Sequence, residues 1–426
     1  MQRSKLRGGI QFSYPPDGLK SPFETVPPPS VATVPLQQDR GGVCALRVKK
    51  NDVVLAGQLI GESPKPNGAS IHAPIPGKVT EVIKAFQDIR GHAVPAVMIE
   101  SDGGATPCEV QAGTDPLAAL QMAGVVDFDR ETAPLAAKLE EARFRNVGTL
   151  IVNALDSEPL LSSRARLLLE KVEKIAAGIN TFKKILDLGR VILTVDANAA
   201  EAVAEAGRAF GGSVQILPLR NKYPQAVDYL IAKRALNVEI PFSLGVRITD
   251  VGALVVDVEA MVAVGRGQPV VERFISVATS KGHIKNLRVA IGTPVRAVLE
   301  HCRIPPEPGG KILAGGPMTG TAITGLDQPV TKEFTGIFVQ GPNEVVKSEE
   351  AVCIKCGLCV EVCPMRLMPF LISGFSEKGK LAEAIHYDIF ACIECGCCSY
   401  LCPVRIPMVQ FIQFAKKQIM AQRKGA

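Results

Sequence analysis

The chain has 426 residues, of which 48 are Lys or Arg and 42 are Asp or Glu, so its formal net charge at pH 7 is only +6. With no Trp, 5 Tyr and no basic cluster interleaved with aromatic residues, the composition argues against a nucleic-acid-binding protein. The most apolar stretch, 251–264, is short and is interrupted by Asp257 and Glu259, so we expect no transmembrane helix. The length favours about two to four domains.

Residues 1–40 are rich in proline and show no periodicity, and three consecutive prolines at 27–29 favour a stiff polyproline stretch. We expect an extended arm that lies along other domains. The alternative is a tail without fixed structure, which the apolar residues of this segment disfavour: Ile10, Phe12, Val31, Val34 and Leu36. The first 20 residues contain no apolar stretch typical of a signal peptide.

Residues 41–112 contain short β segments separated by turn signals, which predicts an all-β module. The segments VKKNDVVLAGQLIGE (48–62) and HAPIPGKV (72–79) resemble the barrel-sandwich hybrid of biotinyl and lipoyl domains. In those carriers a lysine in a hairpin is modified. Here Lys65 stands between Pro64 and Pro66, so we expect a structural module and no carrier site.

Residues 113–238 alternate between helical and strand patterns. Helices are expected at 130–145, 164–178 and 198–210, and strands at 149–152, 191–195 and 214–217. This alternation predicts an α/β domain with a largely parallel sheet. Such sheets often bind a nucleotide at a glycine-rich turn between strand and helix, but neither the strand at 125–126 nor the one at 150–152 is followed by clustered glycines.

Residues 239–344 return to short β segments, with a helix at 295–302 and a strand that runs into a Gly-Gly-Pro turn at 315–317. We interpret that turn as structural. His283 and His301 have no metal-ligating neighbour at suitable spacing, and we expect both to be ordinary histidines.

Residues 345–426 contain the pattern C-x₂-C-x₂-C-x₃-C-P twice, at a constant offset of 39 residues. This duplication is the signature of a bacterial-type ferredoxin with two [4Fe–4S] clusters, in which the fourth Cys of each run ligates the other cluster. The predicted ligands of the first cluster are Cys353, Cys356, Cys359 and Cys402. Those of the second are Cys392, Cys395, Cys398 and Cys363.

Other roles for these cysteines fit less well. Structural zinc prefers two separated C-x₂-C pairs, and a disulfide framework is typical of small secreted domains. Cys397 breaks the repeat, because its counterpart is Leu358, and we expect it to be a spare thiol. Three isolated cysteines are expected to act as small buried hydrophobes: Cys44, Cys108 and Cys302. A final helix at 406–421 either packs on its own domain or docks to a partner or membrane surface.

The order of these segments, together with several short motifs, resembles RnfC, the C subunit of the Rnf ion-translocating ferredoxin oxidoreductase complexes, over essentially the whole length. The motifs are RGGI (7–10), VPLQQDRG (34–41), HAPIPGKV (72–79), GTPV (292–295), GGPMTG (315–320) and CIECGCCSYLCP (392–403). The resemblance implies a multidomain α/β protein. It would comprise a barrel-sandwich hybrid, an α/β domain similar to the flavin subunit of respiratory complex I, a β-grasp segment and the two-cluster ferredoxin domain.

In that family the α/β domain binds FMN and NADH through a GxGGAxFPT loop. The matching residues here, 127–134, read DFDRETAP. The glycines that let backbone N–H groups approach a phosphate are missing. A second family element, GAECEPY, matches 154–160, where only Ala154, Glu158 and Pro159 persist. The resemblance therefore implies a member without FMN or NADH, whose α/β domain serves as a scaffold.

The expected function is an electron-transfer subunit that is cytoplasmic and peripheral on the inner face of the membrane. It would relay single electrons through its two clusters to a ferredoxin, a cytochrome or a flavoprotein. One alternative is a soluble NADH-linked reductase that retains FMN and serves a cobalamin or amino-acid reductase. Another is an assembly subunit with structural clusters. Bound flavin would distinguish the reductase from the relay. Fast reversible reduction of the clusters would distinguish the relay from the assembly subunit.

Overall fold

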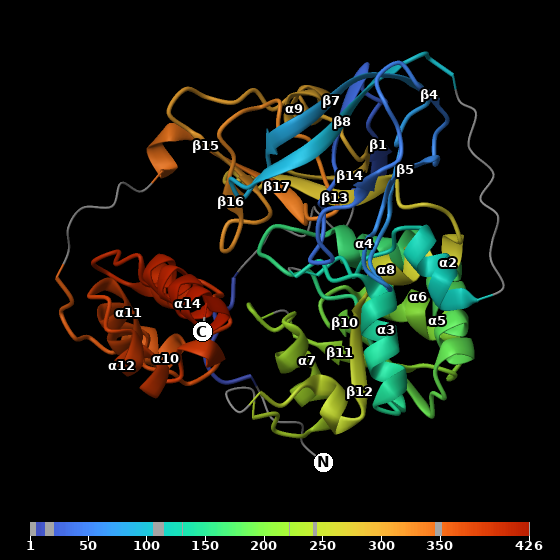
Figure 1. Ribbon diagram of the computed structural model, residues 1–426. Helices are drawn as coiled ribbons and strands as arrows, with labels where there is room; N and C mark the ends of the chain where they lie inside the picture. Colours follow the sequence, from blue (N-terminus) through green and yellow to red (C-terminus); the bar gives the residue numbers. More distant parts are fainter. Residues whose placement is uncertain are drawn as a thin grey trace.

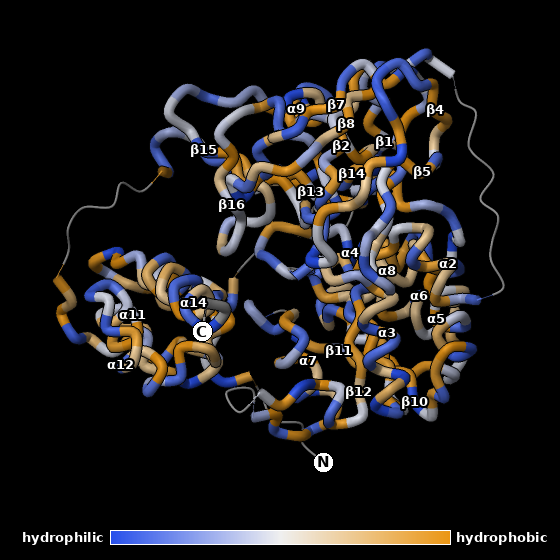
Figure 2. Tube along the Cα trace, in the orientation of Figure 1, coloured by the Kyte–Doolittle hydropathy of each residue, from blue (hydrophilic) through white to orange (hydrophobic). Residues whose placement is uncertain are grey.

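The computed structural model describes residues 6–12, 21–104, 115–129, 131–220, 222–241, 245–345 and 352–425. Cys108 and Arg130 lie outside the described residues. In the view of Figure 1, the barrel and β-grasp strands lie at the top, the α/β domain at the lower right and the cysteine-rich domain at the left. Hydrophobic residues run along the strands and the inner sides of the helices (Figure 2).

The barrel-sandwich module consists of two small sheets. Four strands in the order β2-β8-β7-β4 form one sheet: β2 (Val31–Pro35), β8 (Ala93–Ser101), β7 (Gly77–Gln87) and β4 (Val53–Val54). The other has the order β3-β5-β6: β3 (Ala45–Leu46), β5 (Leu59–Glu62) and β6 (Ile71–His72). Strand β2 belongs to the proline-rich arm, so this segment is part of the module it was expected to lie along.

The α/β domain is built on a four-stranded parallel sheet in the order β11-β10-β9-β12: β11 (Gln215–Leu219), β10 (Arg190–Asp196), β9 (Thr149–Asn153) and β12 (Ala253–Asp257). Successive residues of a strand face opposite sides of a sheet. Thus Leu150 packs in one core and Ile151 in the other. The first core includes residues of helices α3 (Leu135–Phe144), α4 (Ser163–Glu170), α5 (Val172–Ile185), α6 (Ala200–Phe210) and α8 (Val258–Arg266). The second includes residues of α7 (Asp228–Leu236).

Two features of this domain differ from the sequence expectation. Strand β12 pairs with β9, so the sheet extends beyond residue 238, where the boundary was expected. A buried strand is recognisable from its apolar run, but the run does not show which sheet it joins. The residues after β12 form helix α8, whereas only β segments were expected there, because α8 is apolar on most sides and therefore lacks clear periodicity.

The next domain contains a mixed sheet in the order β1-β14-β13-β17-β15-β16: β1 (Phe23–Thr25), β14 (Ile284–Ala290), β13 (Glu272–Thr279), β17 (Gly336–Gln340), β15 (Lys311–Ala314) and β16 (Thr321–Ala322). The central strands β13 and β17 are parallel, and the β13–β14 hairpin is followed by helix α9 (Val295–Cys302). This is the arrangement of a β-grasp fold, to which the arm adds the edge strand β1, parallel to β14.

The cysteine-rich domain has an internal two-fold repeat. Helices α10 (Leu358–Val362) and α13 (Cys397–Leu401) are offset by the 39 residues of the sequence repeat. The preceding glycines, Gly357 and Gly396, have φ of 79° and 80°. Three further helices complete the domain: α11 (Pro369–Glu377), α12 (Leu381–His386) and α14 (Met408–Gly425). Thus the duplication extends from the sequence to the backbone conformation.

The final helix α14 packs on its own domain through its apolar stripe. Its residues Ile412, Ala415 and Ile419 are buried in one core with Ile372 of α11 and Ala384 of α12. This contact supports the first of the two roles considered for the helix. None of the described helices is long and apolar enough to cross a bilayer.

Candidate functional site

Four thiols predicted to bind the second cluster line one pocket of the cysteine-rich domain: Cys363, Cys392, Cys395 and Cys398. Cys363 comes from the end of α10, and the other three come from the loop that leads into α13 and from that helix. Cys397 also contributes to the pocket wall. Burial raises the pKa of the Cys398 thiol to about 12, with a further contribution from the other three thiols. We call this group the inner site.

The predicted ligands of the first cluster lie nearer to the surface. Cys353 and Cys356 are exposed, Cys402 is half-buried, and Cys359 is buried in the same apolar group as Cys398. Burial raises the pKa of Cys359, and the neighbouring Cys353 adds to the shift. We call Cys353, Cys356, Cys359 and Cys402 the outer site.

The donor chemistry fits a multi-iron cluster better than a single metal ion. Four thiolates around one tetrahedral zinc ion lie at Zn–S distances of about 2.3 Å and therefore close to one another. Among the described residues, no three cysteine sulfurs lie within 4.8 Å of each other. Backbone N–H groups also point to the sulfurs, with Leu367 N 3.4 Å from Cys363 Sγ and Glu394 N 3.4 Å from Cys392 Sγ. Such hydrogen bonds help to set the reduction potential of a cluster.

The inner site is covered by residues from the α/β domain and the N-terminal arm. The hydroxyl of Tyr223 donates a hydrogen bond to the carbonyl oxygen of Cys395 at 2.5 Å. Ile10 pairs with Tyr223, and Gly9 N donates to the carbonyl oxygen of Val362 at 2.7 Å. A Cβ atom on Gly9 would lie 2.4 Å from the carbonyl oxygen of Tyr223, so this close approach requires glycine. The RGGI motif of the arm is thus a contact between domains.

The β-grasp domain covers the inner site through the GGPMTG turn. Glu158, in the α/β domain, accepts a hydrogen bond from Met318 N at 2.9 Å and another from the hydroxyl of Thr319. The carbonyl oxygen of Met318 would lie 2.9 Å from a Cβ atom on Gly396, beside the inner cysteines. Glu158 is therefore retained from the flavin-type element as a structural anchor, and the turn has the structural role expected from its sequence.

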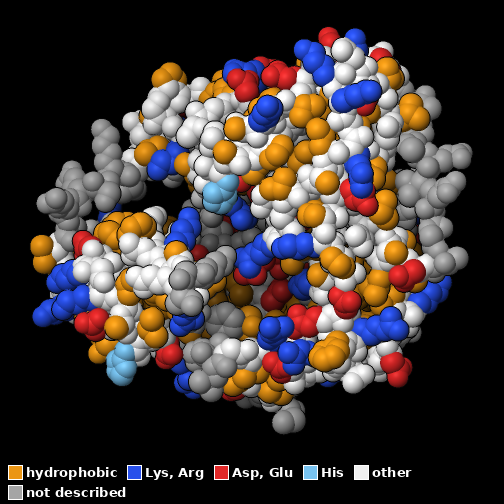
Figure 3. Space-filling model, viewed as in Figure 1, with side chains coloured by type: hydrophobic (Ala, Val, Ile, Leu, Met, Phe, Trp, Pro, Cys, Tyr) orange, Lys and Arg blue, Asp and Glu red, His pale blue; other side chains and the backbone are white. Residues whose placement is uncertain are grey.

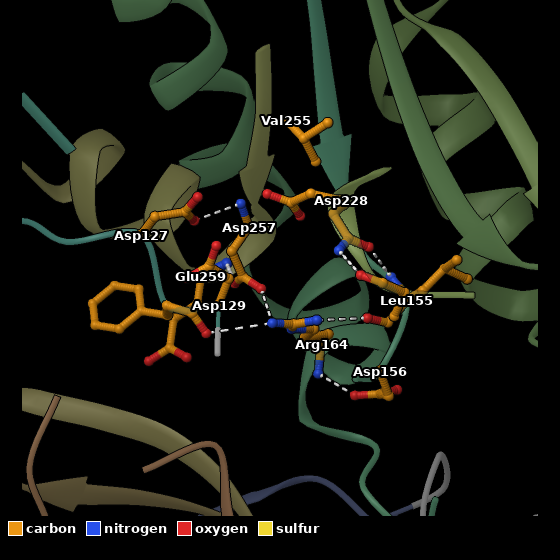
Figure 4. Close-up of polar contacts among 12 residues, drawn as sticks. Asp127, Asp129, Leu155, Asp156, Arg164, Asp228, Val255, Asp257 and Glu259 are labelled. Atoms are coloured by element: carbon orange, nitrogen blue, oxygen red, sulfur yellow. Dashed lines mark hydrogen bonds and ion pairs between the residues drawn. The ribbon is translucent and has the colours of Figure 1, made fainter. Parts of the chain in front are cut away.

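The expected nucleotide crevice of the α/β domain lies where β9 and β12 end, because the strand order reverses between them. Figure 4 shows that ion pairs occupy this position. Lys138 donates to the carbonyl oxygen of Val255 at 3.0 Å, pairs with Asp127 and lies 3.6 Å from Asp228. Acidic and basic side chains gather in the hollow at the middle of the face in Figure 3.

A second cation lies beside the first. Arg164 pairs with Asp257 and donates to the carbonyl oxygens of Leu155 at 2.9 Å and Phe128 at 3.3 Å. Asp257 N in turn donates to Asp127 Oδ1 at 2.8 Å. The end of β12 is therefore tied to the loop that replaces the family's glycine-rich segment.

Three backbone N–H groups that a phosphate could use are already bound within that loop. The carboxylate of Asp129 accepts hydrogen bonds from the backbone of Glu131 at 2.8 Å and Thr132 at 2.9 Å. The backbone N–H of Asp127 donates to Ala133 at 2.8 Å. Phosphate sites in proteins present free backbone N–H groups to the anion. The described residues of this loop instead bind its own carboxylates, so they do not fit an FMN phosphate.

Burial raises the pKa values of several of these acidic side chains. It raises the pKa of Asp228 to about 8; Lys138 opposes the shift, and the neighbouring carboxylates Asp129 and Asp127 add to it. Burial likewise raises the pKa of Asp156 to about 7, although Asp156 accepts a hydrogen bond from Arg164 N at 2.9 Å. Although burial disfavours its charge, Asp127 and then Asp228 hold the pKa of Lys138 above its usual range.

Sequence reasoning did not identify this network or the residues that cover the inner site. Its acids come from segments distant in the sequence, and the available signal was weak: β10 and β12 both end in Asp. Two of the isolated cysteines have the burial expected of them. Cys44 and Cys302 are buried, and burial raises the pKa of each thiol to about 11. His301 lies 3.5 Å from Glu24.

Comparison with known proteins gives matches to three family models. The model of the RnfC barrel sandwich hybrid domain matches residues 4–104. That of the Nuo51 FMN-binding domain matches 120–266, and that of the 4Fe-4S dicluster domain matches 352–406.

Three similar relatives are the C subunits of multisubunit complexes. The chain is 33% identical to the one from the ion-translocating oxidoreductase complex of Rhodobacter capsulatus, over 98% of this chain and 84% of the relative. It is 33% identical to the one from the proton-translocating ferredoxin:NAD(+) oxidoreductase complex of Clostridium ljungdahlii, over 97% and 93%. It is 30% identical to the one from the Na(+)-translocating ferredoxin:NAD(+) oxidoreductase complex of Acetobacterium woodii, over 100% and 99%.

The fold and the duplicated cysteine sites define an iron–sulfur electron-transfer protein with two [4Fe–4S] clusters, built on a scaffold of the flavin-subunit type. Its relatives are subunits of ion-translocating oxidoreductase complexes. The chain belongs to the RnfC family, the C subunits of the Rnf ion-translocating oxidoreductase complexes, which confirms the resemblance drawn from its motifs.

Proposed function

We propose that this protein relays single electrons between partner subunits and a terminal acceptor without an FMN or NADH site of its own. The cysteines of the outer site would hold one [4Fe–4S] cluster and those of the inner site the other. The observation that carries this proposal is the crevice at the ends of β9 and β12, where Lys138 and Arg164 pair with internal carboxylates.

Each iron–sulfur cluster supplies a one-electron redox centre. The protein supplies thiolates, burial and N–H hydrogen bonds to sulfur, which tune the potential. The two sites differ in burial, since Cys395 and Cys398 are buried whereas Cys353 and Cys356 are exposed. Two adjacent centres in unlike surroundings suit a relay with one end inside the protein and one end at its surface.

Charge also opposes a flavin or a nicotinamide nucleotide in the crevice. Both carry phosphate, and the carboxyl groups of Asp127, Asp129 and Asp228 lie close enough together to form one group. Asp228, whose pKa is raised to about 8, is largely uncharged at pH 7, so Asp127 and Asp129 are the acids that would repel a phosphate. At a separation of about 4 Å and an effective dielectric constant of about 20, each unpaired carboxylate costs a phosphate about 4 kcal/mol. Lys138 offsets only part of this charge. Without a flavin, the two-electron hydride of NADH is not divided into single electrons.

The partner is therefore a one-electron protein, such as a ferredoxin, a cytochrome or a neighbouring flavoprotein. That its relatives are subunits of ion-translocating oxidoreductase complexes supports other subunits of such a complex as its partners. Because the described chain has no helix that could span a bilayer, we propose that it lies on the cytoplasmic side and is held at the inner face of the membrane by the other subunits.

A second candidate function is an NADH-linked reductase that retains FMN through altered contacts and serves a cobalamin or amino-acid reductase. The match of residues 120–266 to an FMN-binding domain model favours it. The filled crevice disfavours it, because FMN would have to displace at least the pair formed by Lys138 and Asp127.

The two candidates are separated by quantifying iron, acid-labile sulfide and flavin in the full chain purified without oxygen. We expect about eight irons and no flavin per chain. Dithionite should reduce the clusters, whereas NADH should not, even when FMN is added. Stoichiometric FMN, or FMN-dependent bleaching of the clusters by NADH, would refute the relay without flavin and favour the reductase.

A further inference from the structure

We propose that the exposed surface of the outer repeat is the docking site of an acidic iron–sulfur protein, which exchanges electrons with the outer cluster. This surface, which we call the outer face, consists of Val352, Ile354, Lys355 and Leu358. The proposal rests on the proposed function, since it requires a cluster at the outer site.

The internal duplication provides a reference for the outer face. Each of its residues has a counterpart 39 positions later in the inner repeat: Ala391, Ile393, Glu394 and Cys397. The backbones of the two repeats match closely. The paired residues Lys355 and Glu394 have φ of 57° and 55°, and the cysteines after α10 and α13 have ψ of 117° and 116°. Equivalent residues therefore occupy equivalent positions in the two repeats.

In the inner repeat this surface is covered by other domains. Cys397 is 0% exposed and lies in one apolar group with Tyr223, which is packed by Phe12 and Met318. Ala391 is 7% exposed. The inner face is therefore a contact between the cysteine-rich domain and the rest of the chain.

In the outer repeat the same surface is uncovered, although Val352 and Leu358 are larger and more apolar than their counterparts Ala391 and Cys397. Val352 is 86% exposed where its counterpart Ala391 is 7% exposed, and Leu358 is 41% exposed where Cys397 is fully buried. Ile354 is 62% exposed. Clustered exposed apolar side chains mark interaction sites. Two exposed cluster ligands, Cys353 and Cys356, lie between these residues in the sequence.

The charged residues of the outer face indicate the sign of the charge that its partner carries. Lys355 is exposed and has no ion-pair partner among the described residues, whereas its counterpart Glu394 is held by Lys416 at 2.8 Å and Gln413 at 3.0 Å. Arg405, which follows the outer ligand Cys402, is also exposed.

A positive, partly apolar surface around exposed ligands suits a transient electron-transfer complex. Such interfaces are small, and complementary charge mainly increases their association rate. The partner must carry one electron and negative charge close to its own redox centre, and an acidic iron–sulfur protein meets these requirements. A second copy of this chain does not, because like charges would meet.

The test uses the full chain with its clusters assembled, and an acidic two-cluster ferredoxin as the probe. We compare wild type with Lys355→Glu and Val352→Glu. The latter substitution lies before the first ligand, so it tests the surface even if Lys355→Glu disturbs the cluster. Lys378→Glu, in an exposed turn of the same domain, is the matched control for charge.

Two quantities are measured at low and high salt: the dissociation constant of the ferredoxin complex, and the second-order rate constant for cluster reduction by reduced ferredoxin. At low salt we expect Lys355→Glu and Val352→Glu to weaken binding and to slow reduction at least ~10-fold, and the control to match wild type. Reduction by dithionite and the EPR signals should not change.

Unchanged binding and rates in both variants would overturn the docking site. Equal losses in the Lys378→Glu control would also overturn it, because the effect would then follow from net charge alone. Preferential binding of a basic cytochrome, or self-association through this surface, would replace the proposed partner. A wild-type protein without two reducible clusters would refute the proposed function itself, whatever the binding results.

Discussion

The hydroxyl of Tyr223 lies 2.5 Å from the carbonyl oxygen of Cys395 and connects the α/β domain directly to the loop that holds the inner cysteines. Tyr223 is 7% exposed, and its backbone pairs with Ile10 of the arm. The domain that no longer fits a flavin therefore positions the inner cluster site. Three parts of the chain meet at this tyrosine.

We expect Tyr223→Phe to weaken this connection without unfolding the protein. The substitution removes one largely buried hydrogen bond, with a cost of about 0.5–1.5 kcal/mol. The inner cluster should be lost faster to an iron chelator, and the outer cluster at the wild-type rate, as followed by EPR. Tyr400→Phe is the matched control, because its hydroxyl makes no hydrogen bond to the residues that the structure describes and its ring contact with Phe12 would persist. Equal loss of both clusters would contradict this account.

The assignment of the fourth cysteine of each run to the other cluster gives a second prediction. Cys363→Ala should damage the cluster of Cys392, Cys395 and Cys398, with which Cys363 shares a pocket, and should spare the cluster of its sequence neighbours. Cys402→Ala should have the opposite effect. Iron content and EPR of the single variants provide the measurement.

Cys397→Ala is the control for these variants, since Cys397 lines the same pocket but breaks the repeat. It should retain both clusters. Loss of one cluster in this variant would show that Cys397 is a ligand and that the assignment of the inner site is wrong.

The ion pair between Lys138 and Asp127 gives a third prediction. Asp127 is fully buried, so Lys138→Met leaves a carboxylate without its partner and should lower the free energy of unfolding by about 3–5 kcal/mol. The double variant Lys138→Met, Asp127→Leu should recover part of this loss, because it also removes the fully buried carboxylate; Asp129 and Asp228, which lie 3.9 Å and 3.6 Å from Lys138 in the wild type, still lose that cation. Urea unfolding measures both. A loss in the double variant equal to the sum of the single losses would exclude coupling between the two residues.

The raised pKa of Asp228 gives a fourth prediction, for the pH dependence of stability. Its folded-state value is about 8, above the ordinary value of 3.8, so the native state binds more protons than the unfolded state between these values. The contribution of Asp228 to stability therefore falls as pH rises from about 4 to about 8. Asp228→Asn should flatten this fall in unfolding experiments at several pH values. The exposed Asp187→Asn should leave the curve as in wild type, and a parallel curve for Asp228→Asn would contradict the prediction.

Much of the architecture could be predicted because its signals are local. The strand expected at 149–152 is β9 (Thr149–Asn153), and the helix expected at 295–302 is α9. Gly211, expected to end a helix, caps α6 with φ of 48°. The cysteine repeat was equally informative, since ligand spacing is a property of a short segment.

Features that depend on distant contacts could not be predicted. The helix expected at 164–178 is two helices, α4 and α5, which meet at Lys171. The acidic residues at 127–131 were expected to repel a phosphate. The structure adds Lys138, which neutralises part of that charge by pairing with Asp127, and Asp228, which lies 3.6 Å from Lys138. Neither residue is marked by a motif, because each acts through a neighbour in space.

The arm contact described above also constrains the order in which the chain is assembled during synthesis. Gly9 leaves the ribosome well before its hydrogen-bond partner Val362, which belongs to the cysteine-rich domain. Domains generally fold as units, starting with the N-terminal ones, as the chain emerges. The RGGI segment must therefore remain without this contact until the cysteine-rich domain has emerged, and its binding follows the synthesis of that domain.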